Sequence, residues 1–305
     1  MKAGTRFTLM GAGAVASSLG LALIRQDARA IGVFGRTPSS QRASALAAEI
    51  GADAQLALDA ACQASDLIVI AVPDSQVALV VEEMAETEVD WHGRTVWHTS
   101  GALGSDVLEP LAQAGAAVAA VHPLQSFPGS ARPGALRGAY ATVEGQPAAC
   151  RLARAVLEEA GAHVVQVDLD DKVAVHAAAS ILSNFTVTVA ALAREVLQTT
   201  RLGEQDVVAM LQPLLEGTVS NIRERGPDRA LTGPVVRGDT ETVQRHVELL
   251  AERAPHLLTV YVALATETVR VARKTARLSS GAAMEILDRV IEALPVPPAS
   301  GEQDT

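Results

Sequence analysis

Short apolar runs alternate with longer amphipathic stretches over the first half of the chain. The runs predict strands at residues 7–10, 30–34, 67–72, 95–98, 117–121, 140–144 and 163–167, with helices in most of the intervals. The run over 67–72 (LIVIAV) is apolar at every position, as is typical of a parallel strand buried on both faces. This alternation predicts an α/β fold, with a parallel sheet and crossover helices.

The pattern changes at Asp168. Beyond it the periodicity predicts an all-α part with helices over 170–200, 203–225, 240–253, 254–278 and 280–294. We therefore predict a dinucleotide-binding sheet domain over 1–168, a helical substrate and dimerisation domain over 169–294, and a disordered tail over 295–305, which is rich in proline and polar residues.

The composition is consistent with two globular domains and indicates the cellular compartment. The chain has 305 residues, of which 49% are hydrophobic and 20% charged. Its net charge of −10 argues against nucleic-acid binding. Cys62 and Cys150 cannot form a disulfide framework, so we expect a reducing, cytoplasmic setting. The apolar run over 7–24 resembles a signal peptide, but glycines interrupt it; no later stretch is expected to span a membrane.

A glycine motif follows the first predicted strand. The segment Gly11-Ala12-Gly13-Ala14-Val15-Ala16 opens a helix, which is the context that a dinucleotide-binding fingerprint requires. Gly11 permits the tight turn, Gly13 allows a pyrophosphate to approach the backbone, and Ala16 allows close helix packing. The alternative is a tight turn that binds nothing. The motif favours a bound dinucleotide and a Rossmann-type domain.

The end of the second strand favours NADP(H) over NAD(H). It reads Gly35-Arg36-Thr37, where an NAD-preferring site would place an acidic residue for the ribose. The Arg36 guanidinium and the Thr37 hydroxyl can instead bind a 2′-phosphate. An ordinary solvated arginine is the alternative.

Two further strand ends are expected at the same sheet edge. The segment Ala71-Val72-Pro73 lies at the exit of one strand, and Ser100-Gly101 follows the next. Small, turn-forming residues suit loops that pass beside a cofactor, although ordinary turn chemistry explains a Pro-Asp ending equally well.

The first helix after Asp168 carries the candidate catalytic residues. Lys172, His176, Ser180 and Asn184 recur at steps of four and so share one helical face, among apolar or small neighbours. Such groups are costly in a closed core, so this polar stripe is expected to line a wet or ligand-filled cleft. The alternative is the solvated face of an amphipathic helix.

Other polar residues are less specific. His122 ends a strand at the sheet edge and can line the substrate site or make a structural hydrogen bond; the same two alternatives hold for His98. Arg237 is free to bind a substrate carboxylate, whereas Asp239 is expected to cap the next helix. No residue spacing supports a metal site.

Taken together, the motifs of the chain resemble those of a known protein family. They are the glycine fingerprint, Gly35-Arg36-Thr37, Ala71-Val72-Pro73-Asp74, His98-Thr99-Ser100-Gly101, the segment from His122 to Phe127, Lys172 to Asn184, and Thr232 to Asp239. The chain resembles the Rossmann-like family with a helical C-terminal domain of unknown function (type 2520). That family is similar to ketopantoate reductase, pyrroline-5-carboxylate reductase and the 6-phosphogluconate dehydrogenase group. The resemblance implies an NADP-binding domain followed by a 6-phosphogluconate dehydrogenase-like helical domain.

The resemblance also implies a reaction. Lys172 falls on the general acid of ketopantoate reductase, while His176 and Ser180 stand where asparagines would position the substrate. By this analogy Lys172 donates a proton or hydrogen bond to a carbonyl that accepts hydride, and His176, Ser180 and Asn184 orient the substrate.

Three hypotheses about function follow. The first is an NADP-dependent reductase of a small anionic 2-oxo acid such as ketopantoate. The second is an imine reductase similar to pyrroline-5-carboxylate reductase, and the third is an NADP(H)-binding sensor or scaffold without turnover. The apolar helices of the second half predict a homodimer.

Overall fold

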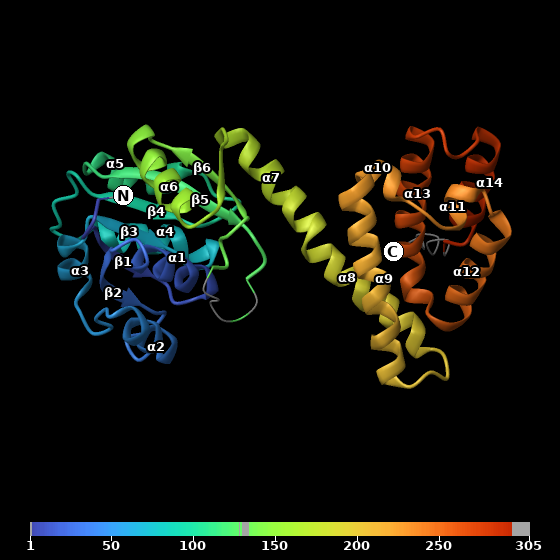
Figure 1. Ribbon diagram of the computed structural model, residues 1–305, viewed down its shortest axis with the longest axis horizontal. Helices are drawn as coiled ribbons and strands as arrows, with labels where there is room; N and C mark the ends of the chain where they lie inside the picture. The colour runs from blue at the N-terminus through green and yellow to red at the C-terminus, as the bar shows by residue number, and fades with distance from the viewer. Residues whose placement is uncertain (1, 128, 130–133, 295–305) are drawn as a thin grey trace, which may run out of the picture. The chain divides into compact units, whose positions relative to one another are not determined.

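A seven-stranded sheet organises the first part of the molecule. The computed structural model describes residues 2–127, 129 and 134–294. The strands lie in the order β2-β1-β3-β4-β5-β6-β7 (Figure 1). Their bounds are β1 Arg6–Met10, β2 Arg29–Phe34, β3 Leu67–Ile70, β4 Thr95–His98, β5 Ala117–Leu124, β6 Tyr140–Gly145 and β7 His163–Gln166. Each of the seven predicted strands is present, and the α/β class is confirmed.

The sequence predicted a parallel sheet, but one strand of the sheet is antiparallel to a neighbour. β6 runs antiparallel to β5, with Val121 opposite Val143, whereas the other neighbouring strands are parallel. Parallel neighbours need a crossover, usually a helix, and the described part of the connection between β5 and β6 contains turns but no helix. β5 also continues past the predicted end at residue 121, so His122 lies within the strand.

Helices cover both faces of this sheet. β3 shows the consequence: all four of its side chains are fully buried, Leu67 and Val69 in one cluster and Ile68 and Ile70 in the other. One face packs against helices that include α1 (Ala14–Ile24), α2 (Gln41–Ile50) and α6 (Pro147–Glu159), and the opposite face against α3 (Leu58–Ala64), α4 (Asp74–Ala85), η1 (Ser105–Leu108) and α5 (Glu109–Gln113).

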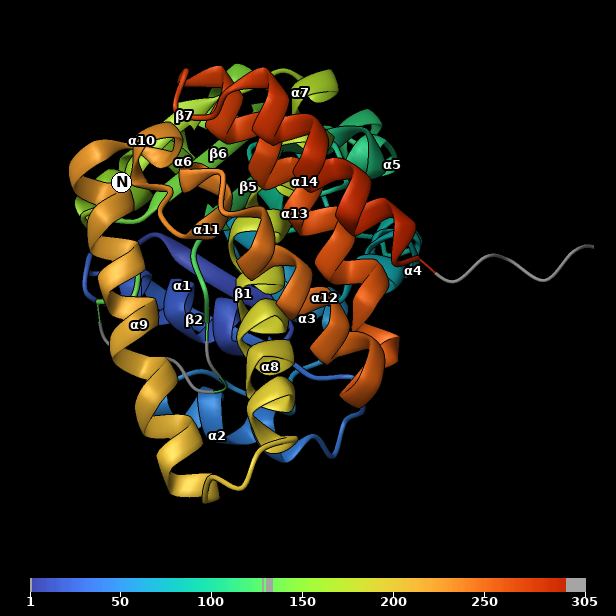
Figure 2. The same ribbon diagram turned by 90° about the vertical axis from the view of Figure 1, so that its right-hand side faces the viewer.

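The second part of the chain is helical. Its elements are α8 (Asn184–Gln198), α9 (Glu204–Arg225), α10 (Pro227–Ala230), α11 (Pro234–Arg237), α12 (Thr240–Arg253), η2 (Pro255–Leu257), α13 (Leu258–Lys274) and α14 (Ser280–Glu292). Helices α12, α13 and α14 pack side by side (Figures 1 and 2) around a core that contains Val247, Val269 and Ile286. The predicted capping role of Asp239 is confirmed, since its carboxylate accepts hydrogen bonds from Thr242 N (3.0 Å) and Oγ1 (2.8 Å).

The first helix after the sheet belongs to the sheet unit. The predicted helix over 170–200 forms as α7 (Leu169–Leu182) and α8, with Ser183 between them. The chain divides into compact units Met1–Asn184 and Phe185–Thr305, so this division lies after α7 rather than at Asp168. The predicted tail over 295–305 lies outside the described residues.

The segment spanning α7 and α8 is unusually apolar. Leu169–Gln198 meets the length and composition expected of a membrane span, with a mean hydropathy of 1.5 over its best window and none of that window buried. The expectation that no such stretch follows the N-terminal run was therefore wrong by that criterion. Composition alone does not distinguish a membrane span from a helix that packs against protein.

Candidate functional site

The glycine turn after β1 leaves the start of α1 open. Gly11 adopts φ +122°, and its N–H donates to Phe34 O at 2.8 Å. A Cβ on Gly11 would lie 2.3 Å from Ala71 O, so glycine is required for this close approach to the end of β3. Gly13 precedes α1, and no side chain of the described residues caps that helix. Its first N–H groups and its dipole can therefore receive an anion.

The remaining predicted cofactor residues lie around this turn. Ala12 and Val15 are partly buried and Ala16 fully buried against the sheet core, while Ala14 begins α1. At the end of β2, Gly35 is followed by exposed residues Arg36 and Thr37. Ala71, Val72 and Pro73 join β3 to α4, and Ser100 and Gly101 follow β4. Parallel strands end at one edge, so the structure brings these segments together there.

His98 is a structural residue of the loop after β4. Its side chain is fully buried; Nε2 lies 2.8 Å from Gly104 O, and Nδ1 accepts from Ser100 N at 3.2 Å. A carbonyl only accepts, so Nε2 carries the proton and the ring is neutral. Burial, the largest effect, lowers the pKa of His98 to about 4. Both ring nitrogens are occupied, so of the two alternatives for His98 the structural one holds.

Lys172 reaches into the same loop from α7. Its side chain is only 1% exposed, and Nζ donates to Ser100 O at 2.7 Å and to Gly101 O at 3.4 Å. Burial lowers the pKa of Lys172 below its usual range, while Glu144 and Asp74 act in the opposite direction. The lysine thus holds the loop after β4 against the first turns of α7.

Glu144 is a charged residue near Lys172 that the sequence reasoning missed. Its carboxylate accepts from Ser105 N and Ser105 Oγ, both at 2.7 Å, and so ties β6 to the start of η1. A carboxylate within the mostly apolar strand Tyr140–Gly145 was the available signal.

Two imidazoles meet above Gly101. The rings of His122 and His176 lie 5.5 Å apart in an edge-on arrangement with an interplanar angle of 77°. A Cβ on Gly101 would lie 2.3 Å from His176 Nδ1 and 2.8 Å from His122 Nε2. Only a glycine lets both rings approach the backbone this closely. The structure therefore brings together Lys172, His176, His122 and Gly101 from three separate segments.

The other predicted substrate residues lie at more exposed positions. Ser180 is partly exposed on α7, and Asn184 is exposed at the start of α8 rather than on α7. Arg237 belongs to the second unit, where its guanidinium lies 3.9 Å from Asp239 and is 64% exposed. Within the described residues, no group of three or more His, Cys, Asp or Glu side chains is placed to hold a metal ion.

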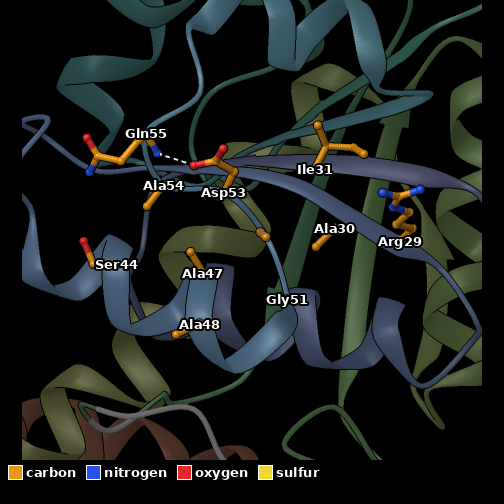
Figure 3. Close-up of a pocket in the computed structure, with 11 residues that line it drawn as sticks. Arg29, Ala30, Ile31, Ser44, Ala47, Ala48, Gly51, Asp53, Ala54 and Gln55 are labelled. Carbon is orange, nitrogen blue, oxygen red and sulfur yellow. Dashed lines mark hydrogen bonds between the residues drawn. The ribbon is translucent and has the colours of Figure 1, made fainter.

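A separate hollow lies on the sheet unit beside β2 and α2 (Figure 3). Its volume is about 630 Å³, and its polar lining includes Arg29, Ser44 and Asp53, whose carboxylate accepts from Gln55 N at 2.7 Å. It shares no residue with the cluster above Gly101 or with the glycine turn. We therefore place the candidate site at the carboxyl edge of the sheet and not in this hollow.

Two family models match the chain. One describes a Rossmann-like domain and matches residues 2–123, and the other describes a domain of unknown function, DUF2520, and matches residues 139–268. The resemblance drawn from the motifs is confirmed at the level of these two domains. No curated protein sequence is similar enough to the chain to count as a match.

Solved structures share the fold. A Bacteroides fragilis protein described as a candidate NADP oxidoreductase is 24% identical, with a TM-score of 0.71 over 87% of this chain and 98% of that one. A protein from Thermotoga maritima is 23% identical, with a TM-score of 0.67 over 88% and 99% of the two chains. An imine reductase from Myxococcus stipitatus, solved with NADP⁺, is 20% identical, with a TM-score of 0.60 over 94% and 99%.

Proposed function

We propose that this protein is an NADP(H)-dependent reductase of a small carbonyl compound, with an anionic 2-oxo acid such as ketopantoate as the best single candidate. One observation carries the proposal. The uncapped start of α1 follows β1, and the cluster of Lys172, His122 and His176 lies beside the ends of β4 and β5, so both lie along the carboxyl edge of one sheet. A dinucleotide site next to titratable side chains is the arrangement that hydride transfer with proton transfer needs.

The residues present fit the cofactor. The backbone after Gly11 and the start of α1 would hold the pyrophosphate, and the open space at Gly13, where no atom lies within 4 Å of a Cβ position, leaves room for it. Arg36 is exposed and makes no ion pair or hydrogen bond with any described residue, so its guanidinium is available for a 2′-phosphate. Bound NADPH would supply a hydride, and the two similar oxidoreductase structures named for NADP support this choice.

The imine alternative is supported by the similar imine reductase structure. The charge of the site favours a carbonyl substrate instead. Lys172 lies beside His122 and His176, and a cationic side chain opposes an iminium cation but attracts a carboxylate or a polarised carbonyl oxygen.

A substrate panel tests the proposal. Purified protein is mixed with NADPH and with 2-oxo acids including ketopantoate, cyclic imines including pyrroline-5-carboxylate, or simple aldehydes, and the loss of NADPH absorbance is followed, with NADH in parallel. We expect NADPH-dependent reduction of a 2-oxo acid. Reduction confined to the imines supports the alternative. NADPH binding without any turnover supports the sensor hypothesis and contradicts a reductase.

We also propose a homodimer formed through the helical unit. Several large apolar side chains on α8 and α9 are exposed, among them Val187 (70%), Leu214 (66%) and Val219 (57%). A membrane span over Leu169–Gln198 is less favourable, because its first turn holds Lys172, which is bonded to the loop after β4. Light scattering in the absence of detergent should give twice the chain mass; a monomer at micromolar concentration contradicts the dimer.

A further inference from the structure

The nitrogen atoms of the cluster differ in what they already bind. His122 Nδ1 lies 3.2 Å from Thr99 O. Since a carbonyl oxygen only accepts, Nδ1 carries a proton, and Nε2 of the neutral ring has a free lone pair. His122 is partly buried. Among the described residues nothing forms a hydrogen bond with its Nε2, and this atom is not enclosed by protein. This nitrogen is therefore available to a substrate.

His176 is held in an arrangement that its own hydrogen bonding does not explain. Its Nδ1 is enclosed and has no hydrogen-bond partner within the described structure. The atom faces Gly101, and the ring meets His122 edge-on. A buried polar atom without a partner is unfavourable, and such exceptions cluster at functional sites. His176 thus packs edge-on against His122 and limits the orientation of the His122 ring.

The ammonium group of Lys172 is already occupied. Nζ donates to two backbone carbonyls, and the side chain is almost fully buried, so no substrate atom can reach it in this arrangement. What it does hold is Gly101, the residue over which both imidazoles lie. Moving Nζ toward a substrate would break the bonds that position this glycine.

We propose that His122 is the catalytic proton carrier, exchanging the substrate's proton at Nε2, and that Lys172 and His176 are positioning residues that hold Gly101 and the His122 ring. This inference rests on the proposed function. In the reducing direction, bound NADPH would supply a hydride to the carbonyl carbon, and the carbonyl π electrons would move to oxygen. The new O–H bond forms as the Nε2–H bond of the His122 imidazolium breaks, which leaves a neutral imidazole and an alcohol. Oxidation reverses each transfer.

The surroundings of His122 set a pH dependence. Burial, Lys172 and His176 lower the pKa of His122 below 6.5, while the bond to Thr99 O and the charge of Asp74 raise it. Reduction needs the protonated ring. Its kcat/KM should therefore fall as the pH rises through this lowered pKa, and oxidation of the alcohol should increase over the same range.

Three variants separate the roles. In His122→Asn the side-chain amide can still donate to Thr99 O, but no titrating nitrogen remains. We expect kcat/KM for reduction to fall by about 100-fold or more, with loss of the pH-dependent limb and with NADPH affinity unchanged. Lys172→Met should lower kcat but keep the limb, moved to higher pH because a nearby positive charge is gone. His92→Asn alters an exposed histidine outside the cluster and should match the wild type.

A measurement on the free protein tests the same assignment without turnover. Long-range ¹⁵N–¹H NMR should show His122 as the Nδ1–H tautomer, titrating below pH 6.5 and at higher pH in Lys172→Met. A His122 ring protonated at Nε2 alone, or His122→Asn with wild-type kcat/KM, overturns the inference while leaving the reductase proposal intact. Loss of the limb in Lys172→Met, with its retention in His122→Asn, assigns the proton to the lysine instead. A wild type that binds NADPH but reduces none of the panel overturns the proposed function and this inference with it.

Discussion

The same methyl group, added at two glycines of the turn after β1, should have different effects: at Gly11 it should lower stability, and at Gly13 it should weaken cofactor binding. In Gly11→Ala the new Cβ would lie 2.3 Å from Ala71 O and 2.8 Å from Ala71 C, well inside the 3.4 Å at which ordinary contact begins. Both are backbone atoms at the end of β3, so no side-chain rotation relieves the clash. In Gly13→Ala the residue keeps φ −80°, and nothing lies within 4 Å of the Cβ.

These contacts set the expected magnitudes. A non-glycine residue at positive φ costs about 1–2 kcal/mol, and overpacking against fixed atoms costs about 1–3 kcal/mol. Gly11→Ala should therefore lower the free energy of unfolding by about 2–5 kcal/mol, a large part of the roughly 5–15 kcal/mol typical of a native protein. Gly13→Ala should change it by less than about 0.5 kcal/mol. Its methyl group instead lies where a pyrophosphate would approach the backbone, so NADPH affinity should fall at least about tenfold.

Tryptophan fluorescence during urea unfolding provides the assay. The chain's two tryptophans, Trp91 and Trp97, are buried in the sheet unit, so their emission reports on that unit. NADPH binding is then measured by calorimetry on the folded variants. Equal unfolding free energies for Gly11→Ala and the wild type would refute the steric argument. A Gly13→Ala variant that binds NADPH as the wild type does would refute the assignment of the turn as a dinucleotide site.

Three other changes test separate parts of the structure. Arg36→Ala should weaken NADPH binding by about tenfold or more through loss of charge-assisted hydrogen bonds, and leave NADH unchanged; Arg29→Ala, at the other end of β2, is the calorimetric control. Lys172→Met leaves two carbonyls unsatisfied and should destabilise the sheet unit by about 1–3 kcal/mol. Because the folded-state pKa of Lys172 lies below its usual 10.5, the unfolded chain binds more protons between these values, and wild-type stability rises with pH there. The deficit of Lys172→Met in urea titrations should therefore widen as the pH approaches 10.5, and a constant deficit would contradict the assigned shift. Asp239→Ala should lower the unfolding temperature of the helical unit by a few degrees in circular dichroism, whereas Asp239→Asn, which can still cap, should not.

The parts of the fold that depend on local pattern were predicted well. Strand positions follow from apolar runs such as LIVI at 67–70, because a buried parallel strand needs apolar side chains on both faces. The antiparallel direction of β6 was missed, since it depends on the long connection from β5 and not on the residues of the strand. Lys172 was singled out by its spacing, but its burial was not foreseen, because its acceptors at Ser100 and Gly101 lie more than 70 residues earlier in the chain.

His98 and His122 show why the chemistry of a site is harder to predict than its place in the fold. His98 ends β4 and His122 lies within the last part of the neighbouring strand β5, and the sequence offered the same two interpretations for both. What separates them is the path of the loop after β4. That loop turns back so that Gly104 O accepts a hydrogen bond from His98 Nε2, while Ser100 N donates one to Nδ1. Both ring nitrogens of His98 are therefore hydrogen-bonded. The same loop offers His122 a single carbonyl, at Thr99, and so leaves Nε2 open above a glycine. His122 is available for chemistry because no neighbouring group forms a hydrogen bond with its Nε2. Whether such a bond forms depends on the path of the loop, and no local sequence pattern predicts it.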